Sequence, residues 1–169
     1  GVSQAVSMAL RAEIQSTGVR VGAFSMRRRY LRNMARFIAF DYGTRRVGVA
    51  VTDSGALIAA PEGTYAPENV DAAIQRLIAA EPCAGFVVGM PGLITGDAAD
   101  STEAIRGFVV GLNKRWPDIP VELVDEDHTS REASLAMVQA GMRKSKRREK
   151  GQLDQIAATL ILQRFLDQR

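Results

Sequence analysis

Two short apolar runs separated by a basic turn are the feature that most constrains how this 169-residue chain can fold. The first run, FIAFDYG at 37–43, ends in an acid and a glycine, and after TRR the second run, VGVAVTD, occupies 47–53. Short runs rich in Val, Ile and Phe, bounded by Gly and Asp, are typical of strands that pair through a tight connection. The segment therefore predicts a β-hairpin.

The rest of the chain alternates between strand and helix patterns. A third strand is expected at 56–65, and Asn69 is a candidate N-cap for a helix that ends before the Glu81-Pro82 break. The further predicted elements are a buried strand at 85–92, a helix at 101–116, a strand at 121–127, a helix at 130–141 and a helix at 152–169. An antiparallel meander followed by helical crossovers predicts a mixed α/β sheet with helices on its faces.

Residues 1–33 show no periodicity that could bury a face, whereas 34–169 has the length of one ordinary domain. We expect 1–33 to be a peripheral or disordered N-terminal extension. Because the chain starts at Gly1, part of this stretch is interpreted as an expression remnant or a processed product. An Arg-rich arm that binds nucleic acid is the alternative.

The basic residues are clustered, which matters more than the net charge of +3. One cluster lies at 27–36, and the other comprises Arg143, Lys144, Lys146, Arg147, Arg148 and Lys150. Such clusters either contact phosphates or form a solvated surface. We predict that the second cluster binds nucleic acid, together with Arg45 and Arg46 of the hairpin turn.

Several protein classes are excluded by what the sequence lacks. Cys83 is the only cysteine, so no intrachain disulfide can form, and no Cys/His cluster has the spacing of a zinc site. No apolar run approaches the roughly 20 residues needed to cross a bilayer. We expect a cytoplasmic protein that does not associate with membranes.

Three acids adjoin apolar sequence: Asp41 at the end of the first strand, Glu126 at the end of the last strand, and Asp154 inside the final helix. Carboxylates in such places need a cation or hydrogen-bond donors, and hard oxygen ligands suit Mg or Mn. Each acid also has a simpler interpretation. Asp41 suits a turn residue, Glu126 a solvated strand end, and Asp154 a helix N-cap or first-turn acid.

The segments FDYGTRRVGVAVTD, VVGMPGLITGD, VDEDHTSREA and KGQLDQIAATLILQRFLD, in this order, resemble the YqgF (RuvX) family of Holliday-junction-resolvase-like proteins and pre-16S rRNA nucleases. The resemblance covers roughly 34–167. It implies an RNase H-like fold with a mixed five-stranded sheet and helices on both faces. It also implies a divalent-metal-dependent nuclease that acts in 5′-end maturation of pre-16S ribosomal RNA or in Holliday junction resolution. By position, it makes Asp41, Glu126 and Asp154 the catalytic metal ligands, for one or two Mg or Mn ions.

One position departs from the family pattern. Where the family has Asp-Glu-Arg after the last strand, this chain has Asp125, Glu126 and Asp127, followed by His128. Loss of that positive charge favours an alternative, a non-catalytic RNA- or ribosome-associated binding factor on the same fold. An actin-like phosphotransferase would need two such domains, for which the chain is too short. Junction cleavage would favour a homodimer, while end trimming needs only a monomer.

Overall fold

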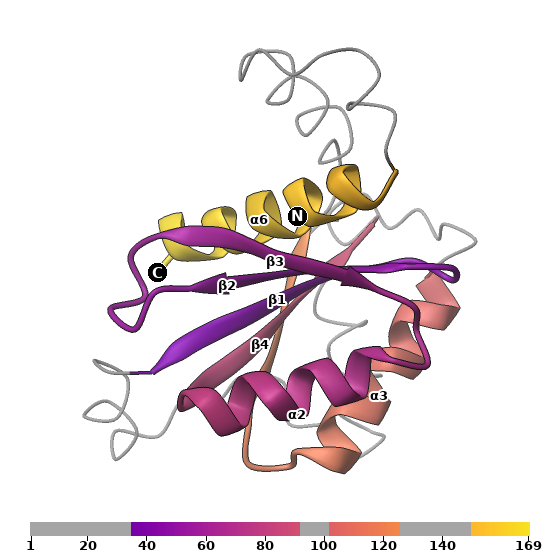
Figure 1. Ribbon diagram of the computed structural model, residues 1–169, viewed down its shortest axis with the longest axis horizontal. Helices are drawn as coiled ribbons and strands as arrows, with labels where there is room; N and C mark the ends of the chain where they lie inside the picture. Colours follow the sequence, from indigo (N-terminus) through magenta and orange to yellow (C-terminus); the bar gives the residue numbers. More distant parts are fainter. Residues whose placement is uncertain (1–34, 92–101, 126–149) are drawn as a thin grey trace, which may run out of the picture.

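The computed structural model describes residues 35–91, 102–125 and 150–169 (Figure 1). Its strands form one five-stranded sheet in the order β3-β2-β1-β4-β5. The strands are β1 (Arg36–Tyr42), β2 (Val47–Thr52), β3 (Ala59–Tyr65), β4 (Cys83–Met90) and β5 (Val121–Asp125). Strands β1, β2 and β3 form an antiparallel meander, while β4 and β5 run parallel to β1. The predicted mixed five-stranded, RNase H-like sheet is thereby confirmed.

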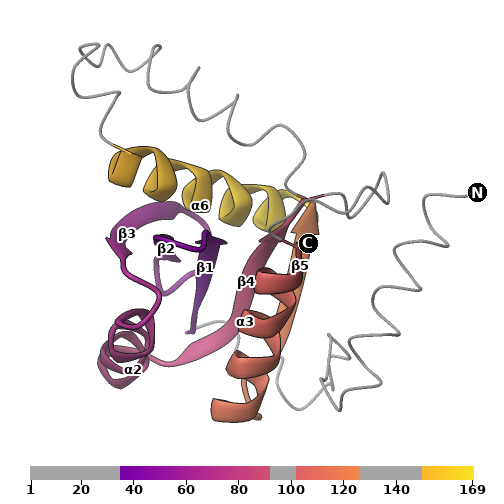
Figure 2. The same ribbon diagram turned by 90° about the vertical axis from the view of Figure 1, so that its right-hand side faces the viewer.

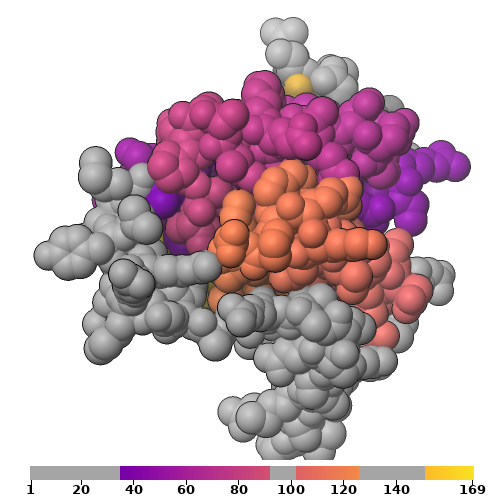
Figure 3. Space-filling model, turned by 90° about the horizontal axis from the view of Figure 1, so that it is seen from below, coloured from indigo at the N-terminus to yellow at the C-terminus, as the bar shows by residue number. Residues whose placement is uncertain are grey.

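Helices cover both faces of this sheet, as predicted. Helices α2 (Val70–Ala80) and α3 (Thr102–Arg115) lie on one face, and α6 (Lys150–Asp167) crosses the other (Figures 1 and 2). Figure 3 shows the α2–α3 face, where the magenta atoms of α2 adjoin the orange atoms of the 102–125 segment. The two layers follow from side-chain alternation along the strands, since successive residues point to opposite faces.

Alternation along β1 divides its side chains between two cores. Ile38 and Phe40 pack with the buried residues of α2 and α3, including Ile74 and Phe108. Phe37 and Ala39 belong to a second core whose helical members come from α6, namely Ala158, Ile161 and Leu162. The buried stripe expected in the final helix is confirmed, and odd-numbered positions of β1 face α6.

The third strand is shorter than predicted, because the chain first makes a turn around Asp53. The Oδ1 atom of Asp53 accepts hydrogen bonds from the backbone N–H groups of Leu57 and Ile58, both at 2.8 Å. Ala56 in this turn has φ of 51°, a left-handed conformation that an extended strand does not use. Strand β3 therefore begins at Ala59 rather than at residue 56.

Other element ends differ from the predictions by small shifts. Asn69 precedes α2 as expected, but its side chain makes no capping hydrogen bond. Strand β4 begins at Cys83, and α6 begins at Lys150 rather than at residue 152. The predicted helix at 130–141 and the extension 1–33 lie outside the described residues. In the described part of the chain, no helix has the length and apolar character that a membrane crossing requires.

Candidate functional site

Asp41 lies near the carboxyl end of β1 with its side chain on the α6 face. It follows Phe37 and Ala39 at two-residue steps, and both of these pack in the core under α6. Its partner across the antiparallel ladder is Gly48 of β2. Directly opposed residues of such a pair project to the same face, with Cβ positions about 5 Å apart. A group that packs against Gly48 is therefore a close neighbour of Asp41.

The backbone of Asp154 lies on Gly48. A Cβ atom added to Gly48 would stand 2.0 Å from the carbonyl oxygen of Asp154 and 3.1 Å from its Cα. Only glycine permits this approach of helix to strand. Asp41 and Asp154 are separated by more than a hundred positions in the sequence, and Gly48, which pairs with one and contacts the other, brings them to the same end of the sheet.

A second glycine flanks Asp41 on its other side. In the parallel pairing of β1 with β4, Phe40 is matched with Val88, so the next step of the ladder sets Asp41 beside Gly89. Gly89 is matched in turn with Val124 of β5. The positions beside Asp41 on both neighbouring strands are therefore glycines, Gly48 on β2 and Gly89 on β4.

Arg46 brings a positive charge to this end of the sheet. Its Nε donates a hydrogen bond of 2.8 Å to Oδ2 of Asp154, an ion pair in which the Asp154 side chain is 22% exposed and that of Arg46 is 40% exposed. Arg46 is positioned by the hairpin turn, where Gly43 N–H donates to the Arg46 carbonyl at 2.8 Å. A Cβ at Gly43 would stand 2.8 Å from that same carbonyl oxygen, so this tight turn requires glycine.

A side chain of β3 makes a hydrogen bond to the first turn of α6. The hydroxyl of Thr64 on β3 donates a hydrogen bond of 2.5 Å to the carbonyl of Gly151. Helix α6 therefore meets β3 at Gly151 and β2 at Asp154, which fixes the height and direction of its first turns. Asp154 is consequently held by backbone contacts rather than by its own side chain alone.

Two of the simpler interpretations of the acids are wrong. Asp41 is a ladder residue inside β1, not a residue of the turn between the strands. Asp154 is neither an N-cap nor a first-turn acid, because α6 begins four residues earlier, at Lys150. Burial of Ala157, Ala158 and Ile161 confirms that Asp154 adjoins the apolar stripe of the helix.

Some predicted site residues cannot be placed. Glu126 follows directly after β5 but lies outside the described residues. Most of the second basic cluster also lies outside them, namely Arg143, Lys144, Lys146, Arg147 and Arg148. Lys150, its last member, begins α6. Arg45 is exposed in the hairpin turn. Among the residues that the structure describes, no three His, Cys, Asp or Glu side chains form a group that could hold a metal. The described part of the site thus contains two of the three predicted acids.

Sequence reasoning did not find the structural roles of Gly48, Gly89 and Thr64. The two glycines match no nucleotide-binding fingerprint, but each interrupts an otherwise apolar strand. A glycine inside a strand is a signal of close backbone approach, so both could have been marked from the sequence. Nothing in the sequence marks Thr64, because its partner Gly151 is 87 residues away.

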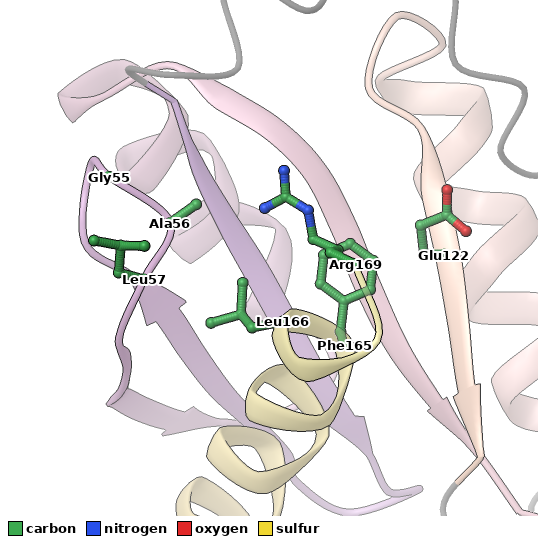
Figure 4. Close-up of a pocket in the computed structure, with 7 residues that line it drawn as sticks. All are labelled: Gly55, Ala56, Leu57, Glu122, Phe165, Leu166 and Arg169. Carbon is green, nitrogen blue, oxygen red and sulfur yellow. The ribbon is translucent and has the colours of Figure 1, made fainter.

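A separate cavity lies toward the C-terminal end of α6, lined by Gly55, Ala56, Leu57, Glu122, Phe165, Leu166 and Arg169 (Figure 4). Its volume is about 650 Å³. The Arg169 guanidinium carbon lies 4.8 Å from the centre of the Phe37 ring, near the beginning of β1. The cavity is therefore at the opposite end of β1 from Asp41 and is not part of the acidic site.

Comparison with known proteins gives a consistent result. Residues 35–168 match the model of the family described as "RuvX: Holliday junction resolvase". A Chlorobium luteolum protein named "Putative pre-16S rRNA nuclease" is 40% identical over 133 residues, 79% of this chain and 94% of that protein. A Bacteroides thetaiotaomicron protein of the same name is 38% identical over 136 residues, 80% of this chain and 99% of that protein.

Among solved structures, T. thermophilus RuvC in complex with Holliday junction substrate aligns with a TM-score of 0.48 and 12% identity. The alignment covers 79% of this chain and 96% of that one.

Proposed function

The chain belongs to the RuvX family of Holliday junction resolvases, and from that premise we propose that it is a metal-dependent nuclease of pre-16S ribosomal RNA. The relatives that match most of its length carry the name "Putative pre-16S rRNA nuclease". The observation that carries the proposal to particular residues is the meeting of Asp41 and Asp154 at Gly48. Two carboxylates from distant parts of the chain share one end of the sheet.

The donor set fits a hard divalent cation. Both described acids offer carboxylate oxygens, the ligand type that Mg²⁺ and Mn²⁺ prefer. The Arg46 guanidinium already places a positive charge beside the half-buried carboxylate of Asp154, which supports an ionised, acceptor-only carboxylate there. When bound, one or two such ions would activate water for attack on phosphorus and stabilise the leaving oxygen.

Glu126 is proposed as the third acid of the site. It comes directly after Asp125, the last residue of β5, whose carboxyl end lies at the same edge as that of β1 because the intervening β4 is parallel to both. Glu126 also comes two residues after Val124, which packs in the α6 core. Side chains two residues apart in a strand point to the same face, so a continuation of β5 would direct Glu126 to that face. Together with Asp41 and Asp154, it would complete a three-acid set.

The remaining residues would handle the substrate backbone. Arg45 and Arg46 stand in the turn that leaves the carboxyl end of β1, next to Asp41. Arginine side chains donate two parallel hydrogen bonds to a phosphate group, which orients it as well as neutralising it. The basic residues from Arg143 to Lys150 precede Asp154 in the sequence and are proposed to hold more of the same strand.

The test is a cleavage assay with purified protein on pre-16S ribosomal RNA, with Mg²⁺, Mn²⁺ or EDTA. We expect cleavage with either ion and none with EDTA. D41N should reduce the rate at least 100-fold, because even residues that only support metal ligands contribute 10- to 100-fold. E103Q is the control, since Glu103 is 90% exposed on α3, across the sheet from α6. Full cleavage by D41N would remove Asp41 from the catalytic set.

The family description favours junction resolution as a second candidate function. A four-way DNA junction should therefore be assayed beside the RNA under the same conditions. Cleavage of the junction alone would move the substrate from RNA to branched DNA. Cleavage of neither, with binding that survives loss of all three acids, would favour the non-catalytic binding factor that Asp127 suggests.

A further inference from the structure

The ion pair between Arg46 and Asp154 joins a residue proposed to bind phosphate with one proposed to bind a metal. The Oδ2 atom of Asp154 accepts a hydrogen bond of 2.8 Å from the Arg46 guanidinium, so a cation that coordinates this oxygen must compete with the guanidinium for its lone pairs. Arg46 and a cation therefore compete for the Oδ2 atom of Asp154, and Nε of Arg46 is not available to a phosphate while the ion pair persists.

We propose that Arg46 is an exchangeable counterion of Asp154, which releases the carboxylate to a divalent cation and transfers to a substrate phosphate. The inference rests on the proposed function, because it assigns an order of contacts within the same site. Arg46 is thus a positioning residue that couples metal binding to nucleic-acid binding.

The geometry of Arg46 allows this exchange. Within the described part of the chain, its side chain makes its polar contact through Nε alone, so the Nη groups keep their N–H donors for solvent or a phosphate. At 40% exposure, the side chain has room to move, whereas the Asp154 backbone is held against Gly48. The arginine is the partner that can leave.

The energetics also allow it. A partly exposed ion pair contributes little, because water screens it and both side chains lose rotamer freedom. A divalent cation shared among carboxylates gains more than this from charge alone. Once the cation has replaced it, Arg46 would be repelled from the site and drawn to the nearest phosphate.

A consequence is positive coupling between the two ligands. A phosphate that engages Arg46 weakens its competition for Asp154, so nucleic acid raises metal affinity, and by linkage the metal raises nucleic-acid affinity. Electrostatic attraction between the bound cation and the nucleic acid would also couple their binding, but this contribution does not depend on the Arg46 guanidinium.

The experiment measures Mn²⁺ binding to the full-length protein by isothermal titration calorimetry, without nucleic acid. Removing the competitor in R46A should tighten Mn²⁺ binding about fivefold, as expected for an ion pair of this exposure. R46K keeps the charge and should bind Mn²⁺ within about twofold of the unaltered protein. Unchanged or weaker Mn²⁺ binding by R46A would overturn the proposal.

R76A is the matched control. Arg76 donates to Glu62 at 2.9 Å, and the Glu62 side chain is 23% exposed, close to the 22% of Asp154. This pair joins α2 to β3, away from the acidic site, so R76A should leave Mn²⁺ affinity unchanged. A comparable gain in R76A would mean that the change reports net charge rather than competition for Asp154, and would also overturn the proposal.

A second readout follows the arginine itself. In an ¹⁵N-labelled sample, the Arg46 Nε–H resonance is assigned by its absence in R46A, and Mg²⁺ is then titrated. When Arg46 is released from Asp154, this resonance should shift. The Mg²⁺ concentration at half of the full shift should equal the concentration at which half of the metal sites are filled. An unmoved resonance at saturating Mg²⁺ would overturn the exchange while leaving the nuclease proposal intact. Absence of any metal binding, in both the unaltered protein and R46A, would instead contradict both.

Discussion

The backbone of Asp154 packs directly against Gly48: a Cβ on Gly48 would stand 2.0 Å from the Asp154 carbonyl oxygen. The same glycine is the ladder partner of Asp41. Gly48 therefore determines how α6 packs on the sheet, and it lies next to both Asp41 and Asp154. A substitution at Gly48 should change stability and activity together.

The substitution G48A should destabilise the fold by about 3 kcal/mol, since the added methyl group forces α6 away from β2. Urea denaturation measures the loss, and cleavage should fall with it at temperatures where the variant is still folded. G107A is the matched control: nothing lies within 4 Å of a Cβ at Gly107 in α3. It should stabilise the protein by about 1 kcal/mol, because alanine is the better helix former. Similar effects of the two variants would contradict the close contact.

The substitution T64V should loosen the first turn of α6 at a cost of about 1 kcal/mol, because the Gly151 carbonyl loses the hydroxyl donor that now lies 2.5 Å away. Hydrogen exchange, followed by mass spectrometry, should show faster exchange at the start of α6 than in the unaltered protein. T64S keeps the donor and should behave like the unaltered protein. Equal protection in T64V would show that the Thr64 hydrogen bond does not hold the first turn of α6.

Asp53 should make the turn before β3 sensitive to acid. Hydrogen bonds from the backbone N–H groups of Ile58 and Leu57 hold the pKa of Asp53 below its ordinary value of 3.8. A depressed pKa means that the carboxylate contributes its full stabilisation above the ordinary value and loses it as pH falls through the lowered one. D53A should therefore be less stable than the unaltered protein at pH 6.

The stability difference between D53A and the unaltered protein should shrink as the pH is lowered below 3.8, the ordinary pKa of Asp53. Urea midpoints at a series of pH values give the comparison. D53N, which keeps an Oδ1 acceptor for Leu57 and Ile58 but has no titrating group, should lie between the two at pH 6. A gap between D53A and the unaltered protein that stays constant with pH would exclude the proposed role of the charge.

Cys83 should be chemically inert in the folded protein. Burial raises the pKa of its thiol to about 12, and only part of this is offset by a backbone hydrogen bond with Gly85 and by nearby Arg36. At pH 8, roughly one thiol in ten thousand would be thiolate, the reactive form. Reaction with a disulfide reagent should be slow at pH 8 and become rapid in urea. Rapid reaction without urea would contradict the raised pKa.

Much of the fold could be predicted because its signals are local. The apolar runs around Asp41 have strand length and end in turn residues, and the stripe that includes Ile161 repeats at helical spacing. These patterns indicated five strands, the helices and the face each must bury. Boundaries were less certain where side chains redirect the chain, as Asp53 does by holding Leu57 and Ile58 in a turn.

The sequence by itself determined which elements form and which acids border apolar surface, because strand and helix periods are visible over a few residues. Only the tertiary structure decided which element covers which face. Arg46 meets Asp154 across 108 positions, and Thr64 meets Gly151 across 87. A periodic pattern says that a face must be buried but not against what, so the contact of α6 with Gly48, which brings Asp41 and Asp154 together, arises only when the sheet and helix pack.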